Sequence, residues 1–363
     1  MTTLAESIQS RFNIDLERVN WVTVVFWAIG IVAIVLILIG SFRSIASGRL
    51  TSTQWRDLIV FGLGQGSIYA LIALGYTMVY GVLGFINFAH GEVFMSGAMI
   101  GFYVAESLNR SGFWDAQPAV SFVIVLLVCM AASTLVAVIV ERVAYKPLRG
   151  SPRLIPLITS IGASFFLQYT FRGFFGAGIK SWPTFDALAG AFQIGGVQIL
   201  KSQALVIVAA ILMMVGLWYF VEKTKVGKTL RAVAEDKEIA ALMGIDVDRA
   251  ILMTFAVGGA MAGAAAMLYS LVFRQVYFFT GFFPGIKAFT AAVIGGIGNI
   301  VGAMVGGLVL GILESLGPSL VLGGFQVTAF TQLKDVVAFL ALVLVLILRP
   351  QGILGERLAE ERG

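Results

Sequence analysis

Three polar residues lie close together in the stretch GFINFAHGEVF. They are Asn87, His90, which is the only histidine of the chain, and Glu92, which is the only charged residue between Asp57 and Glu106. Histidine and glutamate can hold charge or exchange protons where they interrupt an apolar segment, and asparagine can donate and accept hydrogen bonds. One interpretation is that they line or brace a pathway. The alternative is that they satisfy one another and nearby backbone groups, because buried polar groups need partners in any case.

Other kinds of chemistry find little support in the sequence. A single histidine leaves no basis for a Ser-His-Asp triad, and no cluster of His, Cys and carboxylates has metal-ligand spacing. The stretch VGKT at 226–229 resembles the end of a phosphate-binding loop, but Glu222 stands where that loop needs its first glycine. We therefore expect no enzyme activity, no cofactor and no metal.

The composition sets the class of protein that must position these residues. The chain has 363 residues, of which 59% are hydrophobic and only 12% charged, and its mean hydropathy is +0.94. A soluble domain is about 25% charged. Uncharged apolar runs occur at 21–41, 58–81, 116–140, 154–171, 202–221, 250–273 and 288–313, with a shorter one at 336–348. Runs of this length read as transmembrane helices, so we predict an all-α polytopic bundle with about 8–9 membrane segments, some broken or re-entrant. Cys129 lies in one run and has no second cysteine to pair with.

The loops between these runs predict the orientation, because cytoplasmic loops are rich in Lys and Arg. This charge explains the basic pI of 9.3 without nucleic acid as a partner. Basic residues favour the cytoplasmic side for 42–57, which holds Arg43, Arg49 and Arg56, for 141–153, which ends at Arg153, for 222–249, and for the tail from Arg349. Segments 106–115, 172–201 and 274–287, and the N-terminal tail, should face outward.

This orientation constrains the opening stretch. If residue 57 is inside and residue 106 outside, the chain between them crosses an odd number of times. Three crossings would leave each helix below the usual ~17–25 residues, so one crossing plus a broken or re-entrant piece fits better. Gly84 and Gly91 permit the break, and such breaks often mark a transport path.

Segment 288–333 is a second unusual region, with Glu314 as its one charged residue before the last helix. Two full passes and one re-entrant hairpin both fit it. Gly298, Gly302 and Gly306 recur at four-residue spacing, which predicts close helix packing on one helix face. Their partner is either another helix of this chain or a second subunit.

The basic segment 223–250 holds a predicted helix over 228–243, which Gly244 would end. Asp246 or Asp248 can cap the membrane helix that follows. A lone solvated helix is one interpretation. The alternative is that an apolar stripe, made of Leu230, Val233, Ala240 and Met243, contacts a cytoplasmic partner.

Three blocks of sequence resemble a known family. GLGQGSIYALIALGYTMVYGVLGFINFAHGEVFMSGA (62–98) resembles the N-terminal signature of the LivH-like permeases of branched-chain amino acid ABC importers. GKTLRAVAEDKEIAALMGIDVDR (227–249) is similar to their cytoplasmic coupling loop, with Ile239 departing from an alanine of the pattern, and FPGIKAFTAAVIGGIGNIVGAMVGG (283–307) is a third match.

The resemblance implies a domain division and a set of functional residues. Residues 55–355 form the permease domain with its coupling loop at 222–250, residues 1–54 are an extension with one extra helix that the family lacks, and 356–363 are a cytoplasmic tail. The implied translocation pathway contains Gln65, Tyr69, Asn87, His90 and Glu92. The implied ATPase coupling loop contains Arg231, Glu238, Ala240 and Gly244.

The resemblance also implies an assembly in a bacterial inner membrane. The expected partners are the lipid bilayer, a second homologous permease subunit in a heterodimer, two cytoplasmic ABC ATPases and a periplasmic binding protein. Branched-chain or other small amino acids, delivered by the binding protein, are the expected cargo. Urea and short amides remain alternatives within this class. Another alternative is a secondary transporter driven by an ion gradient, although such a transporter should carry more charged residues within the membrane than Glu92 and Glu314.

Overall fold

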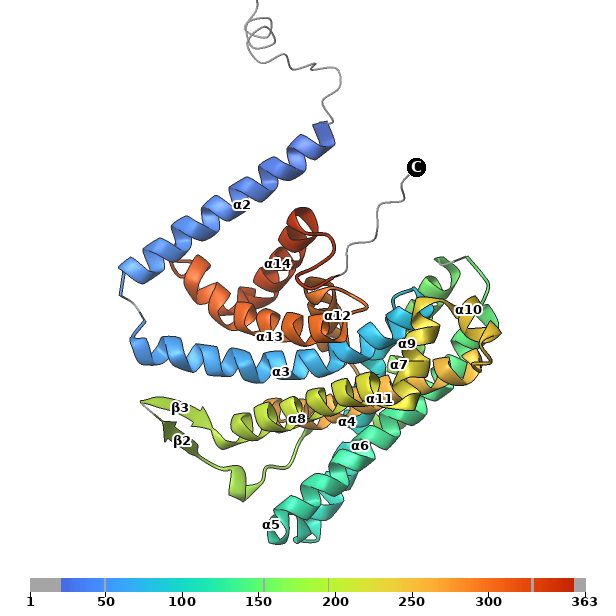
Figure 1. The fold of residues 1–363 in the computed structure, drawn as a ribbon. Coiled ribbons are helices and arrows are strands. Elements are labelled where there is room, and N and C mark those ends of the chain that lie inside the picture. Colours follow the sequence, from blue (N-terminus) through green and yellow to red (C-terminus); the bar gives the residue numbers. More distant parts are fainter. Residues whose placement is uncertain (1–20, 49, 153, 195, 328–329, 356–363) are drawn as a thin grey trace, which may run out of the picture.

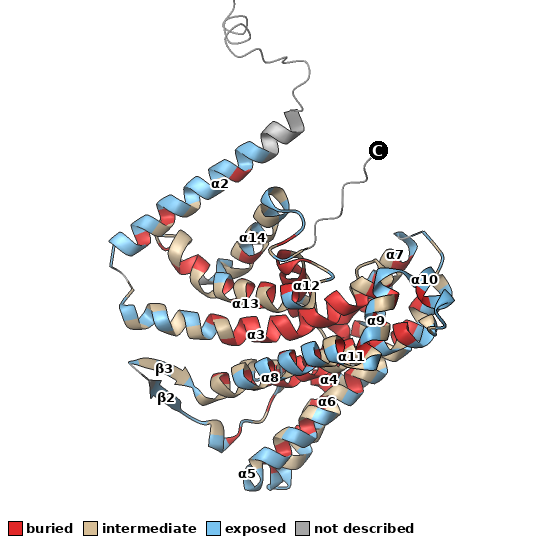
Figure 2. Cartoon of the chain, viewed as in Figure 1, coloured by how far each residue is buried: buried red, intermediate tan, exposed pale blue. Residues whose placement is uncertain are grey.

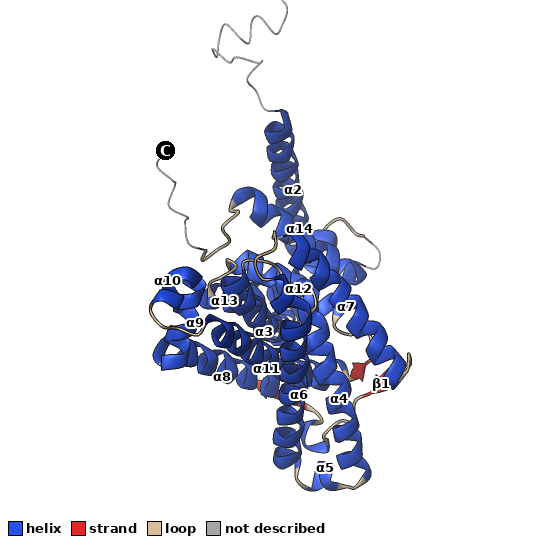
Figure 3. Cartoon of the chain, turned by 90° about the vertical axis from the view of Figure 1, so that its right-hand side faces the viewer, coloured by secondary structure: helices blue, strands red, loops and turns tan. Residues whose placement is uncertain are grey.

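The structure is a computed structural model that describes residues 21–48, 50–152, 154–194, 196–327 and 330–355. The predictions for the N-terminal tail, Arg49, Arg153 and the tail 356–363 concern residues outside these ranges. The described chain is mainly helical (Figure 3), and seven of its helices are long and apolar enough to cross a membrane. The predicted polytopic helical bundle is therefore confirmed.

Helices and short strands follow one another along the chain as labelled in Figure 1. The helices are α2 (Trp21–Ala46), α3 (Ser52–Leu83), α4 (His90–Arg110), α5 (Phe113–Ala116), α6 (Pro118–Val140), α7 (Leu154–Phe175), α8 (Lys201–Lys223), α9 (Lys225–Glu235), α10 (Lys237–Leu242), α11 (Val247–Phe273), α12 (Phe282–Gly295), α13 (Ile300–Gly317) and α14 (Lys334–Leu348). The strands are β1 (Lys180–Ser181), β2 (Ala191–Ile194), β3 (Val197–Leu200) and β4 (Gln275–Val276). Wider π-helical turns extend α6 over Glu141–Tyr145 and α13 over Pro318–Leu322.

Helix α3 forms the centre of the bundle. A capping box fixes its start, because the Thr51 hydroxyl accepts a hydrogen bond from the Gln54 backbone N–H while the Gln54 side chain accepts one from the Thr51 N–H. Its end is Gly84, whose φ of 74° suits glycine. Every residue from 64 to 79 is buried (Figure 2), with α4, α8, α11, α12 and α13 packed around the helix. A helix that is apolar and buried on all sides belongs in a protein core.

The two ends of the bundle are held by different contacts. At one end β1 pairs with β4 in antiparallel register, and the Asp186 backbone N–H donates to Asp115 Oδ1 over 3.0 Å. Segments 106–115, 172–201 and 274–287 therefore meet there. Figure 1 shows α9 and α10 at the opposite end, and Arg149 binds both Asp248, in the first turn of α11 just after α10, and Glu141. The basic loops 141–152 and 222–249 therefore share one end, which the excess of basic residues assigns to the cytoplasm.

The start of α3 corrects the predicted orientation. The backbone N–H of Gln198 donates to Asp57 Oδ1 over 3.2 Å, so residue 57 lies at the same end as the β2–β3 hairpin, which was expected outside. The prediction of a cytoplasmic 42–57 is wrong, because a local count of arginines takes no account of a contact across the fold. Residues 57 and 106 then share one end, and α3 and α4 form an ordinary pair of passes around the break. The odd number of crossings predicted for 58–105 is wrong for the same reason.

The apolar run 288–313 is likewise not one helix. Helix α12 ends at Gly295, and a turn with Gly296 and Gly298 at positive φ leads into α13. With 14 residues, α12 is about 21 Å long, which is short of the ~30 Å hydrocarbon core. Gly298 therefore lies in this turn and not on the predicted helix face. Gly302 and Gly306 do lie on α13, and their backbones pack against residues 291–295 of α12, within this chain.

Helix α2 lies at the edge of the bundle (Figures 1 and 3). Its last turns pack on the segment after α13, where Ser44 Oγ donates to the carbonyl of Ser319 over 2.8 Å and Arg43 lies 5.9 Å from the Phe325 ring centre. Most side chains from Trp27 to Leu38 are exposed. The extra helix is thus attached mainly through its last turns, with a further contact between Gly30 and Ile347 of α14, and within the described residues it does not pack against the central helix α3.

Candidate functional site

Asn87 organises the break between α3 and α4. Its Oδ1 accepts hydrogen bonds from the hydroxyl of Tyr145, at 2.5 Å, and from the backbone N–H of Ala89, at 3.1 Å. Its own carbonyl accepts the N–H of His90. The side chain is buried, so it satisfies the free backbone groups at the start of α4. This geometry makes Asn87 a brace of the turn.

His90 is packed inside the protein. Its ring meets the ring of Tyr76 edge-on, with the ring centres 4.7 Å apart. The ring lies so close to Gly75 that a side chain at that position would overlap it. His90 is 2% exposed and does not line the cavity described below. This packing could not be predicted from the sequence, because it depends on a glycine in the preceding helix.

Glu92 is held by one oxygen and leaves the other without a protein partner. Its Oε1 accepts hydrogen bonds from Gln168 Nε2 at 2.7 Å and from Ser164 Oγ at 3.3 Å, both on α7. Its Oε2 has no hydrogen-bond partner among the described residues, although the residue is only 1% exposed. The carboxylate lies in the first turn of α4, where the helix dipole favours negative charge.

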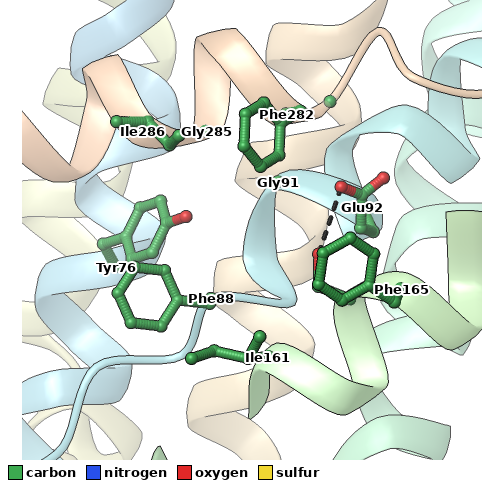
Figure 4. A pocket seen from close by; sticks show the side chains of 11 residues that line it. Tyr76, Phe88, Gly91, Glu92, Ile161, Phe165, Phe282, Gly285 and Ile286 are labelled. Carbon is green, nitrogen blue, oxygen red and sulfur yellow. Dashed lines mark hydrogen bonds between the residues drawn. The ribbon is translucent and has the colours of Figure 1, made fainter. Parts of the chain in front are cut away.

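A cavity of about 240 Å³ adjoins Glu92. Residues from α3, α4, α7 and α12, and from the turn before α4, line it, as Figure 4 shows. Its walls are mostly aromatic and aliphatic and include Phe88, Ile161, Phe165, Phe282 and Ile286. Of the five predicted pathway residues, only Glu92 lines this cavity.

Glycines allow the start of α4 to contact the start of α12 directly beside the cavity. A Cβ atom at Gly91 would come within 2.6 Å of the carbonyl oxygen of Gly281 and 3.2 Å of the Gly285 Cα. Only glycine permits this approach of two backbones. The contact joins parts of the chain that lie far apart in sequence, so spacing alone could not reveal it.

Gln65 and Tyr69 belong to a different region of α3. Gln65 is buried away from the cavity. Tyr69 faces Lys287, with its ring centre 5.8 Å from the lysine Nζ. Lys287 lies 2.7 Å from both Glu314 Oε1 and Asp335 Oδ1, which joins α12, α13 and α14.

Lys287 corrects another expectation. The sequence placed it in the outward segment 274–287, whereas its side chain is 7% exposed inside the bundle. A lysine in an apolar stretch could have been paired with Glu314, since charges within membrane helices seek partners. We call Lys287, Glu314 and Asp335 the ion cluster.

The cytoplasmic loop forms two helices and not the single helix predicted over 228–243. Asp236 breaks it, because its backbone is extended with φ of −152° and its Oδ1 accepts the N–H groups of Glu238 and Ile239 at 2.8 and 2.9 Å. Gly244, at φ 84°, follows α10. Asp246, and not Asp248, caps α11 through the N–H of Arg249.

The predicted apolar stripe is mostly turned inward. Leu230, Val233 and Ala240 are buried against this chain, so only Met243 of the four is available to a partner. The exposed apolar surface is instead made of Ile239, Leu242 and Met243, with Leu242 86% exposed. We call these three residues the α10 patch.

Two predicted coupling residues are charged and accessible. Arg231 pairs with Glu222, with Nη1 2.8 Å from Oε2, and remains partly exposed. Glu238 is exposed in the first turn of α10. Glu238 thus lies on the same short helix as Ile239 and Leu242 of the α10 patch, and Arg231 lies on the preceding helix α9.

A helical membrane protein with a buried carboxylate at a cavity between broken helices has the architecture of a membrane transport subunit. The profile of the family described as "Branched-chain amino acid transport system / permease component" matches residues 58–346. The chain belongs to this family. The match begins inside α3, so α2 lies outside it.

Named relatives cover most of the chain. The high-affinity branched-chain amino acid transport system permease protein BraD of Pseudomonas aeruginosa is 46% identical over 304 residues, which are 82% of this chain and 94% of that protein. The corresponding permease protein LivH of Escherichia coli is 41% identical over 300 residues, or 81% and 93% of the two chains. Among solved structures, PsaBC from Streptococcus pneumoniae in complex with Fab covers 85% of this chain and 96% of that chain, at 12% identity and a TM-score of 0.43.

Proposed function

We propose that this chain is the membrane-spanning permease subunit of an ATP-driven importer in the inner membrane, and that it carries branched-chain or similar small amino acids. The observation that carries the proposal is the agreement with relatives named as high-affinity branched-chain amino acid permeases over more than 90% of their length. The cargo would be delivered from outside by a binding protein. A second, homologous permease subunit would complete the membrane pathway.

The α10 patch supports energy coupling through a separate ATPase. Leu242 and Met243 are among the most exposed large apolar side chains of the molecule, and they lie in the cytoplasmic loop and outside the apolar spans. A short helix that presents apolar residues to the cytoplasm fits a groove on a partner. Gly244 sets the direction in which the chain turns from this helix back into the membrane, because its left-handed backbone is costly for other residues.

The test is uptake by the assembled system. The chain, its second permease, the ATPases and the binding protein are reconstituted in vesicles, and ATP-dependent leucine uptake is measured. Leu242→Ser combined with Met243→Ser should abolish co-purification of the ATPase and uptake, while leaving the permease folded. Met253→Ser, at an exposed methionine of α11, is the matched control. Normal uptake by the double variant would refute the docking role, and absence of any amino acid uptake by the unaltered system would refute the proposed cargo.

A further inference from the structure

The cavity beside Glu92 combines an apolar wall with one free acceptor. Glu92 Oε2 has no partner among the described residues, whereas Oε1 is fixed by Gln168 and Ser164. The carboxylate is thus oriented by α7 through one oxygen (Figure 4). The described residues that line the cavity include no lysine or arginine, so none of them supplies a cation to the other oxygen there.

The chemistry of this arrangement defines its complement. A buried carboxylate accepts hydrogen bonds and attracts positive charge, and its pairing is strongest where water is excluded. The walls formed by Phe88, Ile161 and Phe282 suit an aliphatic body, since burial of apolar surface is favourable. The matching solute therefore carries an ammonium group on a small branched aliphatic skeleton.

We propose that this cavity is a solute-binding site within the permease itself, with the Glu92 carboxylate as acceptor for the ammonium group of a small aliphatic amino acid. This inference rests on the proposed function and deepens it, because it locates a selective step in the membrane subunit. Urea or a short amide would be bound poorly. Such solutes carry no full positive charge to pair with the Glu92 carboxylate.

Equilibrium binding of radiolabelled leucine tests the site directly. The permease–ATPase complex is prepared in nanodiscs without the binding protein, and unlabelled compounds compete with the label. We expect 3-methylbutylamine, which keeps the ammonium group and the branched skeleton, to compete. 4-Methylpentanoate, which keeps the skeleton and a carboxylate, and urea should not compete. Equal competition by 4-methylpentanoate and 3-methylbutylamine would overturn the assignment.

Variants identify the residue responsible. Glu92→Gln keeps the shape and removes the charge, and it should weaken leucine binding by at least about 30-fold, as for loss of one member of a buried charge pair. Glu106→Gln, on the same helix but paired with Arg110 near the surface, should bind normally. Ile161→Trp should also block binding by filling the cavity from its exposed wall, and it leaves Glu92 unchanged.

The outcomes separate this inference from the proposed function. If the unaltered complex imports leucine with its binding protein and ATP, yet the permease–ATPase complex binds none, the site is refuted and the transport function stands. Leucine binding that persists in both Glu92→Gln and Ile161→Trp would also refute the site. If no amino acid is imported at all, the proposed function fails.

Discussion

Two buried glutamates of this molecule differ in whether a cation lies beside the carboxylate. Glu314 lies beside the ammonium group of Lys287, with Asp335 as a third member of the ion cluster. Among the described residues Glu92 has only neutral hydrogen-bond partners, and it lines a cavity. A carboxylate paired within the protein stabilises one arrangement of helices, whereas one that lacks a counter-charge is available to a solute. Both carboxylates are buried, so burial does not distinguish a structural charge from a candidate binding group. Pairing with a cation of the protein does.

Helix α12 connects these two regions. Ile286 lines the cavity, and the next residue, Lys287, forms the ion cluster. Gly285 lies against Gly91 at the start of α4. Because adjacent residues of one short helix take part in both regions, the ion cluster fixes the position of the cavity wall.

The largest effect is expected at the ion cluster, where buried charges are paired with a cation. Lys287→Met leaves Glu314 and Asp335 without their shared cation, and it should lower the free energy of unfolding by about 3–5 kcal/mol. Thermal unfolding of the detergent-purified protein measures this. Lys287→Met combined with Glu314→Gln should recover part of the loss, because fewer charges are then left unpaired. Lys334→Met, at a half-exposed lysine 3.7 Å from Glu314, is the matched control and should cost less than about 1 kcal/mol. A stable Lys287→Met protein would show that the ion cluster is not structural.

A smaller effect is expected at the brace of the break. Asn87→Ala removes an acceptor from both Tyr145 and the Ala89 N–H, and it should destabilise the protein by about 1–3 kcal/mol. Tyr145→Phe removes only one of these bonds and should cost about 0.5–1.5 kcal/mol. Chemical denaturation of the two variants gives the comparison. If Asn87→Ala were fully stable but inactive, Asn87 would belong with Glu92 among the solute-binding groups.

A still smaller change in stability is expected at Glu92. Glu92→Gln keeps an acceptor for Gln168 and Ser164 and removes an unpaired charge, so the unfolding free energy should change by less than about 1 kcal/mol. The same thermal assay used for Lys287 measures it. A loss as large as that of Lys287→Met would mean that Glu92 is a structural charge, and the contrast between the two regions would disappear.

The smallest effect is expected from removal of α2. Deletion of residues 1–46 takes away contacts with the segment after α13 but leaves both the cavity and the ion cluster in place. We expect leucine uptake by the reconstituted system to remain unchanged. An inserted but inactive truncated protein would place α2 within the transport mechanism.

The sequence predicted the class of protein and most of the spans, because long apolar runs report directly on membrane helices. It also identified Glu92 as unusual within such a run. It could not show that Lys287 reaches Glu314, nor that Gly91 meets Gly281, because both depend on segments brought together only by folding. The breaks at Gly295 and Asp236 were missed for a local reason. Each lies inside a stretch whose average composition still favours a helix.

The contact between Asp57 and Gln198 has a consequence for biosynthesis. It leaves Arg43 and Arg56 at the outer end, which is opposite to the side where flanking arginines normally hold a nascent helix. The first two helices therefore cannot acquire their final orientation from their own flanks. We expect α2 and α3 to reach their final orientation only after Lys146 and Arg149 have emerged from the ribosome. Nascent chains stalled before this point should insert these helices in the opposite orientation.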